Sequence, residues 1–186
     1  MSLKHGLLGL LNYGSMTGYE LDKAFKDSLS FFWQAKTSQI YRELNAMEQQ
    51  GWLTSQRVIQ NEKPNKRVYT ITDNGKDEFK NWLSKPESDI SDAMSVKSGF
   101  LMRMFFAGET SIGEALNMLY AYREECSEQI RNMNAAHNAI AEYGAIVKDD
   151  QRIKYWKIAA LYGDEFFQAG LSWTDKAIAV LKEIKS

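Results

Sequence analysis

Residues 37–50 decide the fold, and their sequence is TSQIYRELNAMEQQ. Ile40, Leu44 and Met47 stand four and three positions apart, so a helix over this stretch places all three side chains on one face. Gly51 is a typical residue to end such a helix. The opposite face then carries hydrogen-bonding groups with one cation and no acid: Ser38, Arg42, Asn45 and Gln49.

After this helix the pattern changes to that of strands. Residues 53–60 and 67–72 predict two short strands, and the second is rich in β-branched and aromatic side chains. Residues 61–66, which include proline and asparagine, predict a polar hairpin loop between them. Thr72 is placed to cap a further helix that carries Phe79.

Two more helices are predicted before residue 37. Leucines at helical spacing begin at Leu3 and end at Leu11, and Thr17-Gly-Tyr-Glu20 matches a capping box that opens a second helix. The order is therefore helix, helix, helix, strand, loop, strand, helix. This order predicts a winged helix-turn-helix domain with a small two-stranded wing, in a chain that is mainly α-helical.

Pro86 opens a polar stretch and is the predicted domain boundary, which gives domains of residues 1–85 and 86–186. The first domain carries 12 Lys and Arg against 9 Asp and Glu, a net charge of +3. The second carries 11 against 15, a net charge of −4, so the sum is the formal −1 of the whole chain. The basic half is the one with the winged-helix pattern.

The second domain is predicted to consist of long helices that pack lengthwise. Apolar residues follow alternating steps of four and three from Ile112 to Ile140 and again from Ile153 to Leu181, which is a 3.5-residue repeat. Such helices can pair within one chain, with a partner chain, or both. We favour a dimer, because one slender domain has difficulty burying so many apolar side chains. The predicted dimerisation residues are Leu116, Leu119, Ile130, Met133, Trp156, Phe167, Leu171 and Ile178.

Three other residues on the first long helix have more than one interpretation. Arg123 and His137 fill vacant positions of the repeat, where polar groups fix register or are simply half exposed, and His137 could also make assembly pH-sensitive. Cys126 is interpreted as a small buried hydrophobe in preference to a redox sensor.

The first domain has the residue types needed to bind DNA. An α-helix fits the major groove, where arginine binds guanine and asparagine or glutamine pairs with adenine. The helix start offers backbone N–H groups to a phosphate, and the hairpin loop offers cations. A polar stripe is equally typical of any surface helix, and a basic loop is often only solvated. The candidate contacts from these patterns are Lys36, Thr37, Ser38, Arg42, Asn45, Lys63, Lys66 and Arg67.

Other function classes find little support in the sequence. Two histidines and one cysteine are too few for an ordinary zinc site, and no phosphate-binding loop or nucleophile motif occurs, so we expect no metal, no cofactor and no catalysis. The run Leu7–Leu11 is far shorter than a membrane span, and the single cysteine implies no oxidising compartment. A cytoplasmic protein without a membrane partner is expected.

Several stretches resemble the PadR family of transcriptional regulators. They are Leu7-Leu-Gly-Leu-Leu11, Thr17-Gly-Tyr-Glu-Leu21, Ser38-Gln-Ile-Tyr-Arg-Glu-Leu44, Glu48-Gln-Gln-Gly-Trp-Leu53 and Arg67-Val-Tyr-Thr-Ile-Thr72. The second half is similar to the α-helical C-terminal domain of longer PadR-like proteins, on Leu101-Met-Arg-Met-Phe-Phe106 and Leu171-Ser-Trp173.

The resemblance implies a homodimeric repressor that binds an inverted-repeat operator and is released by a ligand. It places DNA contacts at Ser38, Gln39, Tyr41, Arg42, Lys66 and Arg67, although packing alone also explains Tyr41. A small aromatic or apolar effector is one expected partner, since aromatic residues cluster between Tyr155 and Trp173. An aromatic stripe at helical spacing is more often part of a core, so this cluster has two interpretations. The alternatives are a protein-interaction module or a small-molecule binder that uses the winged helix without specific DNA recognition.

Overall fold

The computed structural model describes residues 3–59, 65–85 and 98–184. The chain divides into two compact units, residues 1–94 and 95–186. The predicted boundary at Pro86 lies outside the described residues.

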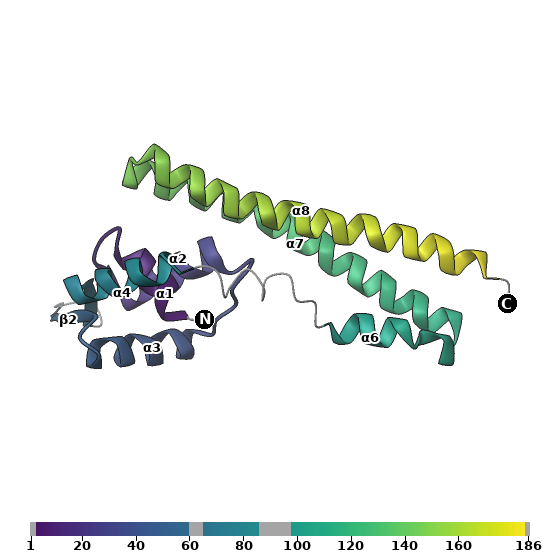
Figure 1. The fold of residues 1–186 in the computed structure, drawn as a ribbon, viewed down its shortest axis with the longest axis horizontal. Coiled ribbons are helices and arrows are strands. Elements are labelled where there is room, and N and C mark those ends of the chain that lie inside the picture. Colours follow the sequence, from purple (N-terminus) through teal and green to yellow (C-terminus); the bar gives the residue numbers. More distant parts are fainter. Residues whose placement is uncertain (1–2, 60–64, 86–97, 185–186) are drawn as a thin grey trace. The chain divides into compact units, whose positions relative to one another are not determined.

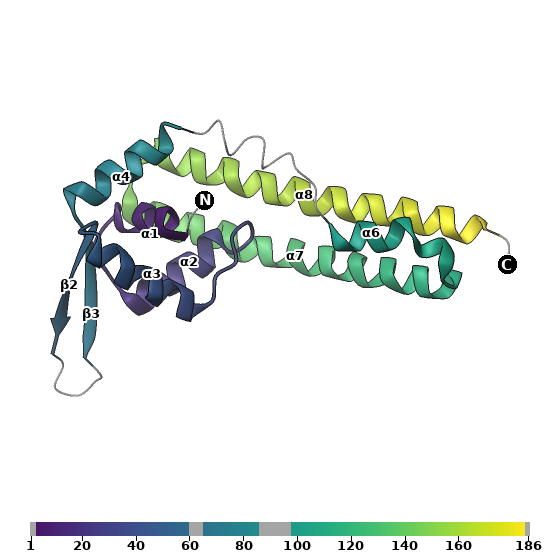
Figure 2. The same cartoon turned by 60° about the horizontal axis from the view of Figure 1, so that its bottom comes forward.

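The first unit is a winged helix-turn-helix domain (Figures 1 and 2). Its helices are α1 (Leu3–Leu11), α2 (Gly18–Leu29), α3 (Thr37–Gln49) and α4 (Asp73–Leu83). Its strands are β1 (Met16–Thr17), β2 (Leu53–Val58) and β3 (Lys66–Ile71).

The sheet has three antiparallel strands in the order β1-β3-β2, one more than predicted. Leu53 is opposite Ile71 in the β2–β3 pair, while Thr17 of β1 is opposite Val68. A strand of two residues such as β1 is too short to show an alternating pattern, so no periodicity in the sequence predicts it. The predicted two-stranded wing is confirmed as the β2–β3 pair, and β1 adds a third strand to the sheet.

The predicted helix signals are present in the structure. Thr17 and Glu20 form the reciprocal capping box of α2, and the Thr72 side chain accepts a hydrogen bond from Gly75 at the start of α4. Gly51, which follows α3, has φ of +72°, a conformation that favours glycine. These local signals set the helix bounds close to those predicted.

The core of this unit lies between the helices and one face of the sheet. The three apolar residues of α3 are fully buried in it, as their spacing predicted. Burial of one such side chain contributes about 1.5–3 kcal/mol. The buried cluster consists of Leu7, Leu8, Leu11, Leu21, Phe25, Ile40, Leu44, Met47, Leu53 and Tyr69.

The second unit is a helical hairpin with a short helix beside it. It contains α6 (Gly99–Phe105), a 3-10 turn η1 (Ala107–Glu109), α7 (Ile112–Val147) and α8 (Asp150–Glu183). The α7 and α8 helices lie side by side over most of their length (Figure 2). Phe100 of α6 stacks on Tyr122 of α7, with ring centroids 4.6 Å apart, and meets Trp173 of α8 edge to face.

The repeat predicted from the sequence pairs α7 with α8 inside one chain. Small residues allow the close approach, because a Cβ on Gly170 of α8 would lie 2.9 Å from Sγ of Cys126 on α7. Cys126 is buried there, which agrees with its interpretation as a hydrophobe.

The predicted dimerisation residues need revision on this evidence. Leu119, Met133 and Ile178 are buried within one chain, so they form no surface for a partner. The other five, Leu116, Ile130, Trp156, Phe167 and Leu171, are half-buried. A 3.5-residue repeat predicts that a helix pairs but does not identify the partner helix, and the tight turn at Lys148 and Asp149 supplies one from the same chain.

The polar positions of the repeat are paired across the hairpin. Arg123 Nε donates to Asp175 at 2.7 Å, and His137 Nε2 lies 3.0 Å from Asp164. Both acids lie on α8, so each pair favours one alignment of the two helices. This observation agrees with the register interpretation. Within the described residues, no helix is both long and apolar enough to span a membrane.

Candidate nucleic-acid interface

The outer face of α3 is polar and accessible. Because Ile40, Leu44 and Met47 anchor the inner face, the opposite face is exposed, as the helical spacing predicted. None of its side chains is acidic. The exposed residues are Ser38, Arg42, Asn45 and Gln49.

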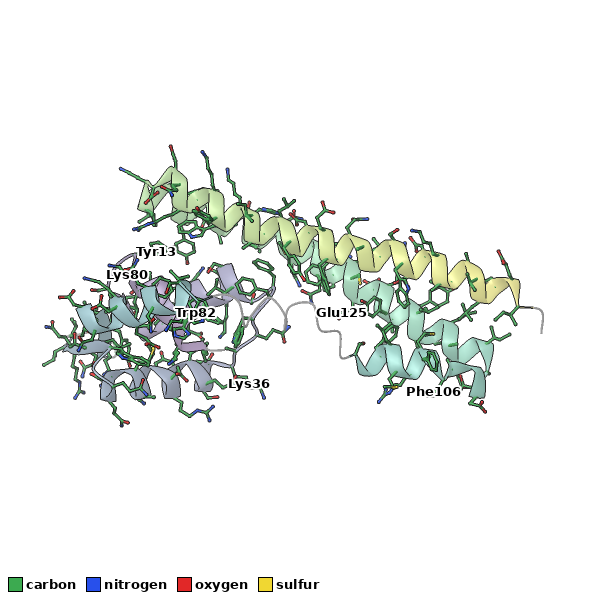
Figure 3. The ribbon with its side chains drawn as sticks, in the orientation of Figure 1. Tyr13, Lys36, Lys80, Trp82, Phe106 and Glu125 are labelled. Carbon is green, nitrogen blue, oxygen red and sulfur yellow. The ribbon has the colours of Figure 1, made fainter. Side chains whose placement is uncertain are left out.

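Two of the predicted contact residues at the start of α3 hold the helix in place. Thr37 Oγ1 accepts a hydrogen bond from Lys26 Nζ at 2.7 Å and lies 3.3 Å from Asp22, both on α2. Gln39 Oε1 accepts from the backbone N–H of Lys36 at 2.8 Å. Lys36 is exposed at this end of the helix (Figure 3). The α3 start is therefore fixed to α2 and capped by its own glutamine.

Tyr41 packs on the first residue of α2 and is also accessible. Its side chain is 40% exposed, and its ring contacts the position where Gly18 has no side chain. The packing explanation and the contact explanation given for Tyr41 are both compatible with this geometry.

The predicted wing residues differ in their surroundings. Lys66, at the start of β3, is exposed, whereas Lys63 lies outside the described residues. Arg67 is not a free cation: its Nη2 donates to Glu48 of α3 at 2.6 Å and its Nε donates to Ser55 of β2 at 2.7 Å. The guanidinium also lies over the ring of Tyr69, whose pKa is raised by burial.

The wing carries a further exposed cation that was not predicted from the sequence. Arg57 of β2 is exposed and stands directly opposite Arg67, so both side chains are on the same face of the sheet. Leu53, Ser55 and Arg57 follow the two-residue period of a strand, with Leu53 buried. That period could have placed Arg57 on the α3 side of the wing once the buried face was known.

The described residues offer no metal site, but they do form an open groove. Three or more His, Cys, Asp or Glu side chains never gather there in an arrangement that could hold a metal ion. An open groove of about 510 Å³ lies between α7 and α8, lined by His137, Ile140, Ala141, Gly144, Ala145, Ile153 and Lys157.

Comparison with known proteins identifies the family. Residues 7–81 match the transcriptional regulator PadR-like family, and residues 96–182 match the virulence activator alpha C-terminal family. The negative transcriptional regulator PadR of Bacillus subtilis is 33% identical over 138 residues, which cover 74% of each chain. This chain belongs to the PadR-like family of transcriptional regulators.

Solved structures of PadR-like proteins share the whole fold. Bacillus subtilis PadR in complex with operator DNA has a TM-score of 0.75 and 27% identity, covering 96% of this chain and 98% of that one. A Streptococcus mutans protein has a TM-score of 0.76 and 26% identity, with 96% and 99% covered. Bacillus subtilis PadR in complex with p-coumaric acid has the same fold, with a TM-score of 0.69 and 24% identity, with 98% and 96% covered. The family and these relatives are transcriptional regulators, not enzymes.

Proposed function

We propose that this PadR-like regulator is a repressor that binds an inverted-repeat operator as a homodimer. The observation that carries the proposal is the exposed, acid-free outer face of α3, next to a wing with exposed cations. The same fold occurs in Bacillus subtilis PadR, which is known in complex with operator DNA. Repression is the activity named for that relative. Such a protein acts on DNA in the cytoplasm.

In this proposal, α3 enters the major groove and the wing contacts the backbone beside it. Arg42 and Asn45 are long or planar enough to reach base edges, with arginine suited to guanine and asparagine to adenine. Ser38 and Lys36 lie at the helix start, where a phosphate contact is expected. Lys66 contributes a phosphate contact from the wing. Thr37 and Gln39 instead hold the α3 start in position, because their side chains are already hydrogen bonded.

We propose that the dimer forms through the outer side of α8. This side faces away from the buried residues Ala160, Thr174 and Ile178, yet it is also apolar. Large exposed apolar side chains are uncommon on a monomer unless they form an interaction site. A second copy of this chain covers them by twofold symmetry, which also provides the second α3 that an inverted repeat requires. The stripe consists of Tyr155, Ile158, Tyr162 and Phe166, each 55–63% exposed.

Release of DNA by a small aromatic molecule belongs to the same proposal. Bacillus subtilis PadR is known in complex with p-coumaric acid, a phenolic carboxylic acid. The direct test is to add p-coumaric acid to the complex of this regulator with its selected DNA. Release of the DNA at micromolar to millimolar p-coumaric acid supports an aromatic effector. A complex that is unchanged counts against p-coumaric acid as the effector.

The main proposal is tested by selecting binding sequences from a random duplex library with the purified full chain at two salt concentrations. We expect an inverted repeat whose half-site centres are about 34 Å apart, one turn of DNA. Salt-sensitive binding without an enriched sequence would leave only a basic surface. Binding at neither salt would favour the protein-interaction module.

A further inference from the structure

We propose that Arg67 is a positioning residue that holds the wing against α3, and that Arg57 opposite it supplies a second phosphate contact of the wing beside that of Lys66. The proposal rests on the proposed DNA-binding function. It assigns two arginines that face the same side of the sheet to different tasks.

Arg67, Glu48 and Ser55 form a closed ring of hydrogen bonds across three elements. Arg67 Nη2 donates to Glu48 Oε2 at 2.6 Å, and Arg67 Nε donates to Ser55 Oγ at 2.7 Å. Ser55 Oγ in turn donates to Glu48 Oε1 at 2.7 Å. A planar guanidinium donates two hydrogen bonds in fixed directions, so it fixes the orientation of the wing relative to α3. A lysine ammonium does not have this fixed geometry. The ring therefore links α3 to both long strands of the wing.

Arg67 cannot leave this ring for a phosphate without a cost at α3. Glu48 lies on the helix proposed to enter the groove, and its side chain is 28% exposed. Without Arg67, an unpaired carboxylate would stand close to the negative DNA backbone, where like charges repel. Arg67 also lies 3.5 Å from Asn45 Oδ1, a long contact that brings the same guanidinium beside a proposed base-reading side chain.

Arg57, in contrast to Arg67, is not held by neighbouring side chains of the described residues. It is exposed, and among residues of described position it has neither an ion pair nor a hydrogen bond. Two arginines directly opposite each other on a sheet repel, and Glu48 compensates only the charge of Arg67. The charge of Arg57 thus remains available for an anion on the α3 side of the wing. A DNA phosphate is the anion that the proposed docking brings there.

Four variants of the full chain separate the two roles: Arg57→Met, Arg67→Met, Glu48→Gln and the double variant Glu48→Gln/Arg67→Met. Affinity is measured over a range of salt concentrations, for the inverted repeat that the wild type selects and for a scrambled duplex of equal composition. Thermal unfolding of the wild type, Glu48→Gln, Arg67→Met and the double variant gives the coupling between Glu48 and Arg67 without DNA.

For Arg57→Met we expect affinity for both duplexes to fall by a similar factor, with a slope of log affinity against log salt that is smaller by about one. For Arg67→Met we expect the preference for the repeat to fall about tenfold while the slope is unchanged. Glu48→Gln also lowers the preference for the repeat. The double variant retains at least as much of this preference as Arg67→Met alone.

Any one of three results would overturn the proposal. The first is a salt slope smaller by about one for Arg67→Met with the preference for the repeat retained, and the second is an unchanged salt slope for Arg57→Met. The third is that the effects of Glu48→Gln and Arg67→Met on thermal stability are additive. A wild type that prefers no sequence would instead refute the proposed function. In that case the unfolding measurements still decide whether Arg67 and Glu48 are coupled.

Discussion

Gly18 and Tyr41 are in direct contact: a Cβ on Gly18 would lie 2.7 Å from Cε1 and 2.9 Å from the hydroxyl oxygen of Tyr41. Gly18 is the first residue of α2, and Tyr41 is in the second turn of α3. The absence of a side chain at Gly18 thus lets the tyrosine ring lie against the start of α2.

Gly18→Ala is expected to displace the Tyr41 ring and weaken DNA binding. Alanine favours a helix over glycine by about 1 kcal/mol, so lost helix propensity cannot explain a loss of function. The matched control is Gly14→Ala, because a Cβ at Gly14 meets no atom within 4 Å. Affinity for the selected repeat should fall for Gly18→Ala and stay near wild type for Gly14→Ala. Equal affinities for both would show that the Tyr41 position is unimportant for binding.

Arg42→Ala and Lys66→Ala should affect DNA binding in different ways. If Arg42 contacts a base edge, its loss costs about 1–3 kcal/mol and relaxes sequence preference at one base pair in each half-site. If Lys66 contacts a phosphate, its loss weakens binding to every sequence and lowers the salt slope by about one. Affinities for a set of single-base variants of the repeat measure both effects. Uniform weakening by Arg42→Ala would make Arg42 a phosphate contact.

Phe166→Glu should separate the proposed dimer into monomers. A carboxylate in the middle of the apolar stripe on α8 must be buried without a partner, so we expect the dimer dissociation constant to rise about 100-fold or more. Gln168→Glu is the control, because it adds the same charge at an exposed position of α8 two residues away. Sedimentation equilibrium distinguishes the two variants. A dimer of unchanged strength in Phe166→Glu would exclude this stripe as the interface.

The effect of Gly170→Ala on the free energy of unfolding should change sign when Cys126 is replaced by alanine. In the wild type the new Cβ would lie 2.9 Å from Cys126 Sγ, and overpacking of this kind typically costs about 1–3 kcal/mol. In a Cys126→Ala background the sulfur is gone, so the helix propensity of alanine should make Gly170→Ala stabilising by up to about 1 kcal/mol. Urea unfolding of the four proteins tests this. Equal effects in both backgrounds would mean that Cys126 and Gly170 do not limit the α7–α8 approach.

His5→Phe should reduce the loss of stability between pH 7 and pH 5. Burial lowers the pKa of His5 below the 6.5 of the unfolded chain, despite its hydrogen bond to Glu78. The unfolded state therefore binds a proton more readily, and the free energy of unfolding falls as the pH drops below 6.5. Phenylalanine keeps an aromatic ring where His5 stacks on Trp82, with centroids 4.6 Å apart, but does not titrate. The free energy of unfolding is measured from pH 7 to pH 5 for both proteins. Equal slopes against pH for wild type and variant would show that another group causes the loss of stability.

The sequence predicted the parts of this molecule that depend on local spacing. The inner face of α3 and the capping box at Thr17 follow from residues within one or two helical turns, and they are present in the structure. The two-residue strand β1 was missed because its only support is pairing with a strand about 50 residues later.

Features set by tertiary contacts could not be predicted in the same way. The 3.5-residue repeat was visible, but that α8 is the partner of α7 depends on the turn between them. The pairing of Arg67 with Glu48 depends on how the wing packs on α3, which no short-range pattern describes. Both arginines of the wing therefore look alike in the sequence, although only one has an ionic partner among the described residues.

The central claim is that two copies of this regulator place their α3 helices in successive major grooves. Hydroxyl-radical footprinting of the selected repeat with the full chain tests it most directly. We predict two equivalent protected patches on one face of the duplex, about 34 Å apart, both lost with Phe166→Glu at concentrations that saturate the wild type. A single patch, or protection that does not depend on the α8 stripe, would contradict the account.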